Sequence, residues 1–280
     1  YWRDWSSDVC SSDLLAFFVL AYIMTGLLAG YVAYSSNLGD PTYMICFKVF
    51  GAFLFNWFYL CITLVSIILI SKIGHSIGQH RYFCHKSFIT TRTKEIVLLF
   101  LSTIATTYSA IYYSAVHRYH HMHSDKELDP HNPVRQGRML SFLGFIDNEI
   151  ASKIPGKIIK DLLKDPVIVF CHRYYLLIIC LFCFMLIIID PLLLLFCYMI
   201  PVGYTQLING SQIVFGHGLG YQNFDTGDKS SNNIFWNWVT LGEGLHNNHH
   251  HNPAAYDFAY TKQQYEYDIS GMFIKYFFKK

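Results

Sequence analysis

The amino-acid sequence predicts an all-α integral membrane protein with a histidine-rich region outside the membrane. Three observations support this fold class. Of the 280 residues, 53% are hydrophobic and only 14% are charged, whereas soluble domains average about 25% charged residues. Several stretches of about 20 residues lack Asp, Glu, Lys, Arg and His, and a helix of that length crosses a hydrocarbon core of about 30 Å. Eight of the fourteen histidines lie in three short runs outside those stretches.

The apolar stretches predict four transmembrane helices. The first two are uninterrupted, while the third and fourth come from residues 174–216, where Asp190 is the only charged residue. As one helix this region would measure about 65 Å, which is roughly two crossings. Because proline disfavours helix in the residue before it, we expect a hairpin that turns at Asp190 and Pro191. The predicted spans are residues 15–34, 49–71, 170–189 and 192–212.

Lysine and arginine predict the orientation of these helices. Residues 72–173 contain 14 of them and residues 229–280 contain five, whereas residues 35–47 contain none. Because cytoplasmic loops carry the excess of positive charge, we expect a cytosolic helical cap made of residues 72–169 and 213–280. All three histidine runs lie in this cap, which places the histidine site on the cytoplasmic face of a multi-pass protein.

Residues 15–280 are expected to form a single domain, because the two cap segments alternate with the membrane helices. Residues 1–14 resemble the translation of a sequencing adapter and are excluded from the fold prediction. Residues 93–115 are apolar but rich in Thr, Ser and Tyr. A crossing there would separate the first two histidine runs, so we expect a helix at the membrane interface or within the cap.

The histidine runs predict a site for two metal ions. Imidazole is the commonest protein ligand for transition metals, and spacings of three and four residues place side chains on one helix face. Eight ligands exceed the roughly four to six that one ion needs, and iron or another first-row metal suits nitrogen ligands. A cysteine-rich set typical of structural zinc is absent from the sequence. The runs supply His80, His85, His117, His120, His121, His246, His249 and His250.

Two further features of these runs are the spacing of His80 and His85 and the position of Glu243. We expect the second transmembrane helix to continue to His80, and His85 then lies about 140° further around an α-helix. Both reach one ion pair only if the helix bends or ends between them. Glu243 precedes His246 by three residues, but the second Glu-x-x-His motif typical of soluble di-iron proteins is absent. We therefore expect Glu243 either to contact a ligand rather than a metal or to lie at the start of a helix.

The three runs, their order and the helix pairs between them resemble the membrane fatty acyl desaturases, close to the delta-9 acyl-CoA desaturases. Gly78-Gln-His-Arg-Tyr-Phe-Cys-His85 is similar to the first histidine box, with Cys84 where serine is usual. His117-Arg-Tyr-His-His121 is similar to the second box, and Gly242-Glu-Gly-Leu-His-Asn-Asn-His-His250 is similar to the third. The resemblance covers the chain from Leu15 to its end.

The resemblance implies a ninth ligand, His217. The family carries an asparagine four residues before this histidine, where it holds a metal-bound water. This sequence has Ile213 there instead, and the nearest upstream asparagine is Asn209. The resemblance implies no catalytic residue beyond the metal ligands. Polar side chains that would support the ligands are Asn209, Glu243, Asn247 and Asp129.

The implied activity is an oxygen-dependent desaturation that introduces a cis double bond into a saturated fatty acyl chain, delivered as acyl-CoA or acyl-lipid. Its implied cofactors are two iron ions, cycling between Fe²⁺ and Fe³⁺, with O₂ as co-substrate. The sequence contains no haem-binding cytochrome domain, so the resemblance implies an external electron donor. That partner is expected to be ferredoxin-like, or cytochrome b5-like with its reductase.

Other functions remain open at this stage. Membrane hydroxylases, ketolases and alkane monooxygenases carry similar histidine boxes, although the third box favours a desaturase. A membrane metal transporter belongs to a different class, and it would place its ligands inside the membrane helices; here the charge-free stretches that predict those helices contain no histidine. The net charge of +2 gives no basic field for nucleic acid.

Overall fold

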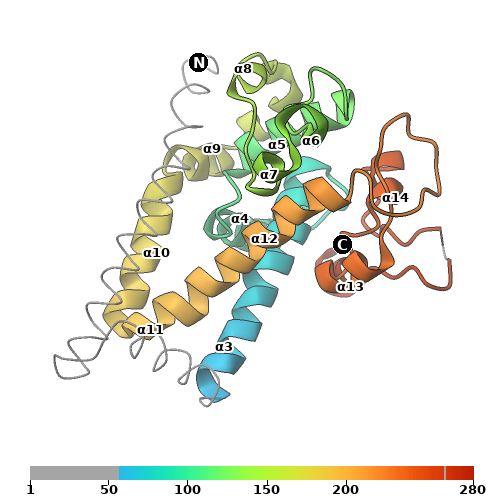
Figure 1. Cartoon of the computed structure of the whole chain (residues 1–280). Helices are drawn as coiled ribbons and strands as arrows, with labels where there is room; N and C mark the ends of the chain where they lie inside the picture. Colours follow the sequence, from blue (N-terminus) through green and yellow to red (C-terminus); the bar gives the residue numbers. More distant parts are fainter. Residues whose placement is uncertain (1–56, 262) are drawn as a thin grey trace, which may run out of the picture.

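The computed structural model describes residues 57–261 and 263–280. The predicted span at residues 15–34, the start of the span at 49–71 and the adapter-like segment lie outside the described residues. Within the described ranges the chain is helical, and β-structure is limited to three isolated bridges around Asn232 and Ser230. Figure 1 shows the long helices at residues 57–84, 175–189 and 191–215, here called the shaft, extending away from an end where the short helices gather.

One continuous helix, here called the rod, forms part of the shaft. Helix α3 (Trp57–Ile67) runs directly into the π-helix η1 (Ile68–Cys84). Together they form an apolar helix of 28 residues, which is long enough to cross a membrane. The second half of this rod carries the first histidine run away from the apolar shaft and toward the short helices (Figure 1).

A helical hairpin flanks the rod. Helix α10 (Tyr175–Ile189) ends at Asp190, where the backbone becomes extended and the carboxylate accepts a hydrogen bond of 2.9 Å from the backbone N–H of Leu192. The return arm is a second candidate span of 25 residues, Pro191–Phe215. It consists of α11 (Pro191–Leu193), η4 (Leu194–Met199) and α12 (Ile200–Phe215). The chain therefore turns at Asp190 and Pro191.

The other arm of the hairpin differs from the expected span at residues 170–189. Helix α9 (Pro166–Arg173) and α10 are bent by 71° at Tyr174, so only the part from Tyr175 follows the shaft. A new helix begins at Pro166 because Asp165 caps its first turn. The described residues thus contain two candidate membrane spans, or three if the bent pair counts as one.

Residues 93–115 form two helices instead of one crossing. Helix α4 (Arg92–Ile104) packs along η1, and α5 (Ala110–His123) returns beside it. Glycines allow the close approach, because a Cβ on Gly74 would lie 2.5 Å from the Leu101 carbonyl oxygen and one on Gly78 would lie 2.7 Å from Ser102 Oγ. Ser102 donates a hydrogen bond of 2.9 Å to the Gly74 carbonyl. The first two histidine runs consequently lie on the same side.

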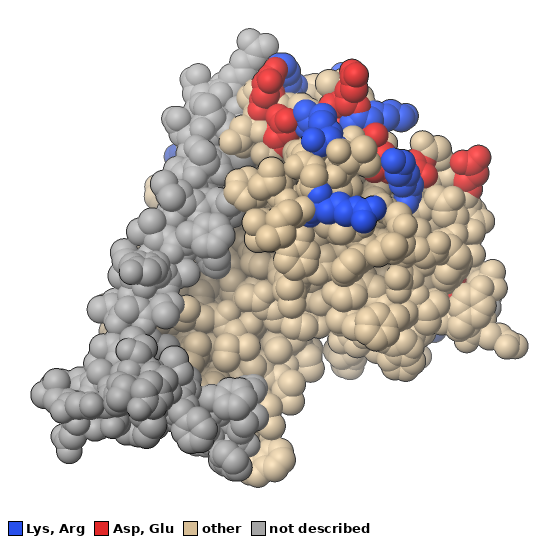
Figure 2. All heavy atoms as spheres, viewed as in Figure 1, with Lys and Arg blue, Asp and Glu red and all other residues tan. Residues whose placement is uncertain are grey.

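Short helices complete the histidine-bearing end. Charged side chains gather at this end on the face shown in Figure 2, over the helices between α5 and α9, while the described part of the shaft shows other residues. This distribution fits a membrane protein with one polar end. The short helices are α6 (Pro133–Gln136), α7 (Arg138–Phe142), α8 (Asn148–Ala151), η2 (Gly156–Ile159), η3 (Leu162–Lys164), α13 (Ile234–Thr240), α14 (His246–His251), α15 (Ile269–Phe273) and η5 (Ile274–Phe278).

Candidate metal centre

The structure brings all nine candidate ligands together in two neighbouring clusters. Within each cluster the potential ligand atoms lie within 4.8 Å of one another. Three imidazoles come from α5, three from α14, one from η1, one from the residue that directly follows η1, and one from the segment that follows α12. The first cluster contains His80, His85, His117, His121 and His249. The second cluster contains His120, His217, His246 and His250.

Helix periodicity explains why two clusters form. On α5, His117 and His121 are one turn apart and both belong to the first cluster, while His120 belongs to the second. On α14 the arrangement is reversed, since the pair one turn apart belongs to the second cluster and His249 to the first. Adjacent residues on a helix diverge by about 100°. Each His-x-x-His-His run therefore contributes to both clusters.

The π-helical geometry of η1 aligns His80 and His85. A π-helix closes through hydrogen bonds between residues five apart, and the backbone N–H of His85 donates to the His80 carbonyl at 3.2 Å. The two rings consequently lie on one face and meet edge to face, with centroids 4.9 Å apart and ring planes at 75°. The sequence predicted that the helix must bend or end between them, and η1 does end at Cys84, directly before His85, after several π-helical turns.

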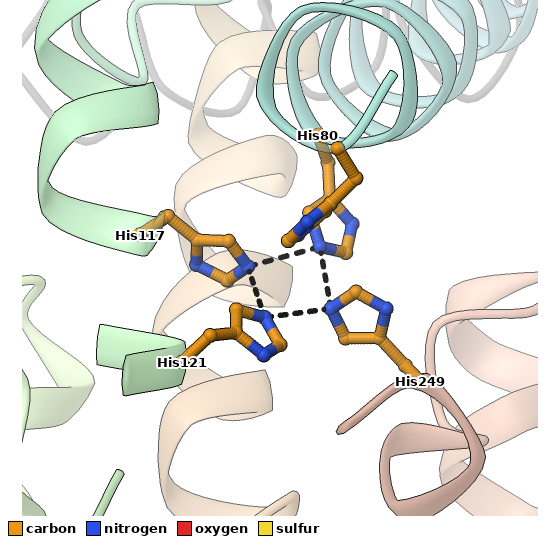
Figure 3. A group of neighbouring side chains, drawn as sticks. His80, His117, His121 and His249 are labelled. Atoms are coloured by element: carbon orange, nitrogen blue, oxygen red, sulfur yellow. Dashed lines mark hydrogen bonds between the residues drawn. The ribbon is translucent and has the colours of Figure 1, made fainter. Parts of the chain in front are cut away.

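The first cluster has the dimensions of a metal site. In Figure 3 the Nε2 atoms of His80, His117, His121 and His249 form a closed ring whose sides are 3.0–3.1 Å. Nitrogens at the corners of such a square lie about 2.2 Å from its centre, close to the metal–nitrogen distances of about 2.0–2.1 Å found in proteins. The Nε2 atom of His85 is also buried and has no hydrogen-bond partner among the described residues. This donor set fits a first-row transition metal.

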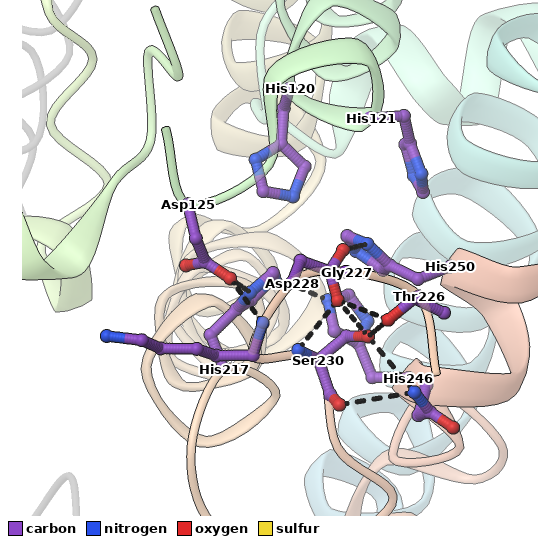
Figure 4. Close-up of polar contacts among 12 residues, drawn as sticks. His120, His121, Asp125, His217, Thr226, Gly227, Asp228, Ser230, His246 and His250 are labelled. Atoms are coloured by element: carbon purple, nitrogen blue, oxygen red, sulfur yellow. Dashed lines mark hydrogen bonds and ion pairs between the residues drawn. The ribbon is translucent and has the colours of Figure 1, made fainter. Parts of the chain in front are cut away.

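Aspartates orient three rings of the second cluster. His120 Nδ1 donates to Asp129 at 2.9 Å and His217 Nδ1 donates to Asp125 at 3.0 Å. The third pair, which joins His250 Nδ1 to Asp228, measures 2.7 Å (Figure 4). A proton held on Nδ1 leaves the Nε2 lone pair of a neutral ring facing the cluster centre, as in histidine ligands that are supported by carboxylates. Three such lone pairs converging on one point suit a cation.

Glu243 supports the first cluster as part of a buried ion network. Its carboxylate accepts hydrogen bonds from His80 Nδ1 at 2.9 Å and from Arg81 at 2.8 Å. Arg81 is fully buried, also pairs with Asp268 at 2.6 Å and stacks 3.8 Å above the ring of Phe258. Because a buried guanidinium needs carboxylate partners, this network fixes the position of Glu243 and, through it, of His80.

The electrostatics of the first cluster favour neutral imidazoles and an ionised Glu243 carboxylate. Burial and the neighbouring imidazoles lower the pKa of His117, His121 and His249 well below the usual value. Burial would raise the pKa of Glu243, but the charges of Arg81 and His80 outweigh it and hold that pKa well below its usual range. Neutral imidazoles with charged carboxylates behind them are the forms that bind metal.

The remaining candidates and two unpredicted residues differ in their roles. Asn247 contacts no histidine ring among the described residues; its Oδ1 accepts the backbone N–H of Asn223 and Phe224 at 2.8 and 2.9 Å and so fixes the loop beside α14. Asn209 lines the adjacent cavity. Sequence reasoning missed Asp125 and Asp228, for which the available signal was a carboxylate in a polar loop close to a histidine run.

A cavity of about 470 Å³ opens beside the clusters. Histidines of both clusters form part of its wall, including His80, His117 and His246. The wall between the shaft helices is mainly apolar, with Ile179 and Leu207 as examples. A cavity of this size with few polar groups accommodates an apolar chain segment.

Comparison with known proteins agrees with this geometry. The sequence model of the fatty acid desaturase family matches residues 55–267, which include every histidine of both clusters. The chain belongs to the fatty acid desaturase family. The resemblance to membrane fatty acyl desaturases of delta-9 type is thereby confirmed.

Relatives come from animals and a cyanobacterium. The delta(9)-fatty-acid desaturase fat-7 of Caenorhabditis elegans is 32% identical over 211 residues, which cover 68% of this chain and 60% of the relative. The sn-1 stearoyl-lipid 9-desaturase of Anabaena variabilis is 29% identical over 79% of this chain and 81% of its own length. The acyl-CoA delta(11) desaturase of Trichoplusia ni is 31% identical over 71% and 62%. The chain spans less than two thirds of the first and third relatives.

Proposed function

We propose that this protein is an oxygen-dependent acyl desaturase of the delta-9 type, which introduces a cis double bond into a saturated fatty acyl chain. The observation that carries the proposal is a pair of adjacent imidazole clusters on the wall of an apolar cavity. Relatives named as delta(9), delta(11) and stearoyl-lipid 9-desaturases support it. The proposed substrate is an acyl chain carried by coenzyme A or by a lipid.

Two iron ions, one in each cluster, are the proposed cofactors, and they would supply with O₂ the oxidising power that side chains lack. The nine histidines would hold these ions, with five in the first cluster and four in the second. Glu243 and Asp129 keep protons on the outer Nδ1 atoms of their histidines and so direct the inner Nε2 atoms toward the ions.

The cavity wall would hold and orient the acyl chain. Ile179 and Leu207 offer apolar contacts that exclude water, while the histidines mark the part of the wall where reaction takes place. Holding one pair of methylene groups against that wall determines which carbons are desaturated. This positioning is the role we assign to the shaft helices.

The proposal includes the membrane arrangement and the electron supply. We propose four transmembrane helices in one domain, with the histidine site on the cytoplasmic face, supported by the candidate spans and by the charged end seen in Figure 2. Electrons would come from an external donor, ferredoxin-like or cytochrome b5-like. Such a donor docks at the polar end, outside the hydrocarbon core.

Expression in a host that lacks unsaturated lipids tests the proposal, with mass spectrometry of the cellular fatty acids as the readout. We expect monounsaturated chains with the double bond at carbon 9, and none from the His249→Ala variant. A hydroxylated chain would favour the related monooxygenases instead. A double bond at another carbon would remove only the delta-9 assignment, and unmodified chains, with a suitable donor present, would overturn the activity.

A further inference from the structure

Gln212 carries a buried amide at the edge of the second cluster. It lies in the last turn of α12 and lines the cavity together with His217 and His246. Its Oε1 and Nε2 atoms are both buried and have no hydrogen-bond partner among the described residues. Because buried amide groups are nearly always hydrogen-bonded, this side chain is suited to a polar partner in the cavity.

Gly216 brings this amide close to the cluster. A Cβ on Gly216 would lie 2.8 Å from Gln212 Nε2 and 2.7 Å from His246 Cδ2, so those two atoms are at most about 5.5 Å apart. In an imidazole ring Cδ2 is bonded to Nε2, the atom that His246 turns toward His217 at 3.1 Å. Because Gly216 has no side chain, the Gln212 amide has room beside the edge of the His246 ring that carries Nε2.

The two clusters differ by one donor. The first has five imidazoles and the second has four. Amide oxygens bind hard cations and are compatible with first-row metals. The oxygen and nitrogen of an amide exchange places through a half-turn with no change of shape, so Oε1 reaches the position that Nε2 occupies.

We infer that Gln212 completes the donor set of the second cluster, with its amide oxygen contacting the metal ion or a water bound to that ion. This inference rests on the proposed function, because it requires metal in the second cluster. Ile213, the next residue, has no donor to offer. Gln206, on the same helix, already donates a hydrogen bond of 2.6 Å to the Thr106 carbonyl.

Iron binding to the purified full chain tests this inference. Metal-free protein in detergent micelles is titrated with Fe²⁺ under anaerobic conditions, and bound iron and Mössbauer spectra are recorded. Wild-type protein should bind two irons. Gln212→Leu should keep the first iron and bind the second about 10- to 100-fold more weakly, the usual effect of losing a supporting polar contact. Only one of the two iron signals should change.

Matched variants separate a direct role from a loss of folding. Gln212→Glu keeps an oxygen donor and should restore the second iron, whereas Gln206→Leu removes a neighbouring amide and should leave both irons bound. Retention of the first iron by Gln212→Leu shows that the variant is folded. Unchanged affinity in Gln212→Leu, or loss of the second iron through Asn209→Leu in its place, overturns the inference and leaves the proposed function standing. A wild-type chain that binds no pair of irons overturns both.

Discussion

The two histidine clusters are supported in different ways. Four rings of the first cluster come from helices and the fifth, His85, directly follows η1; among the described residues, only His80 of this cluster is hydrogen-bonded to a carboxylate. In the second cluster His217 follows the end of α12, and three of the four rings donate to aspartates. Those aspartates lie in irregular segments, namely Asp125 and Asp129 after α5 and Asp228 before α13.

Because of this difference, we expect changes near the first cluster to alter the stability of the whole protein and changes near the second cluster to alter mainly its metal affinity. The carboxylate of the first cluster belongs to a buried ion network that joins η1 to the residues before α15, so disturbing it affects the whole protein. The aspartates of the second cluster contact mainly histidines and loop backbone, so disturbing them should affect the local site. The first cluster is thus connected to a buried ion network, while the second depends on its loops.

Removing Arg81 should have the largest effect. Arg81→Met leaves Glu243 and Asp268 buried without their cation, and breaking a buried ion pair costs about 3–5 kcal/mol. We expect this loss in thermal unfolding of the metal-free protein in detergent, followed by circular dichroism. Arg92→Met is the matched control, because Arg92 is 46% exposed in its ion pairs, and surface pairs contribute only about 0–1 kcal/mol. Equal losses in the two variants would contradict a stabilising core around the first cluster.

Much of the first cluster was predictable because helix periodicity determines it. The spacing of His117 and His121 places both rings on one helix face, and the charge-free segments predict the long helices around them. The sequence did not reveal the π-helix that aligns His80 with His85. Amino-acid composition does not distinguish a π-helix from an α-helix. The π-helix was therefore recognisable only from the structure, in which η1 packs against α4 and α5.

The supporting residues of the second cluster were harder to predict. Asp129 was identified through family resemblance, whereas Asp125 and Asp228 reach His217 and His250 from loops whose paths depend on tertiary contacts. Asn247 is adjacent to a candidate ligand in sequence, and its amide oxygen accepts hydrogen bonds from a loop backbone. Proximity along a helix is readable from spacing, while proximity between loops is not.

One carboxylate variant in each cluster should weaken a different iron. Glu243→Gln should weaken the first iron and Asp228→Asn the second, each by about 10- to 100-fold, because either change removes the carboxylate that orients a histidine. Glu243→Gln should also lower the melting temperature more than Asp228→Asn does, because Glu243 belongs to the buried ion network with Arg81 and Asp268. Iron titration monitored by Mössbauer spectroscopy, together with thermal unfolding, measures both effects. If both variants weakened the same iron, the assignment of these carboxylates to separate clusters would be wrong.

The pH dependence of the stability of the metal-free protein should show the smallest effect. Burial alone would raise the pKa of Asp129, but His120 outweighs it and lowers the pKa to about 2 from the usual 3.8. The folded state therefore favours the ionised carboxylate more than the unfolded chain does. This stabilisation is complete above about pH 4 and is lost as the pH falls toward 2.

The size of this loss of stability tests whether the ion pair of Asp129 with His120 contributes to the stability of the fold. The lowered pKa of Asp129 corresponds to at most about 2 kcal/mol. Melting temperatures of wild-type and Asp129→Asn protein, measured without metal between about pH 5 and pH 3, should converge as the pH falls, because the wild type alone loses this contribution. A constant gap would mean that Asp129 stabilises the fold through its hydrogen bonds to backbone N–H groups rather than through His120. The loop would then hold its shape independently of the histidine that it supports.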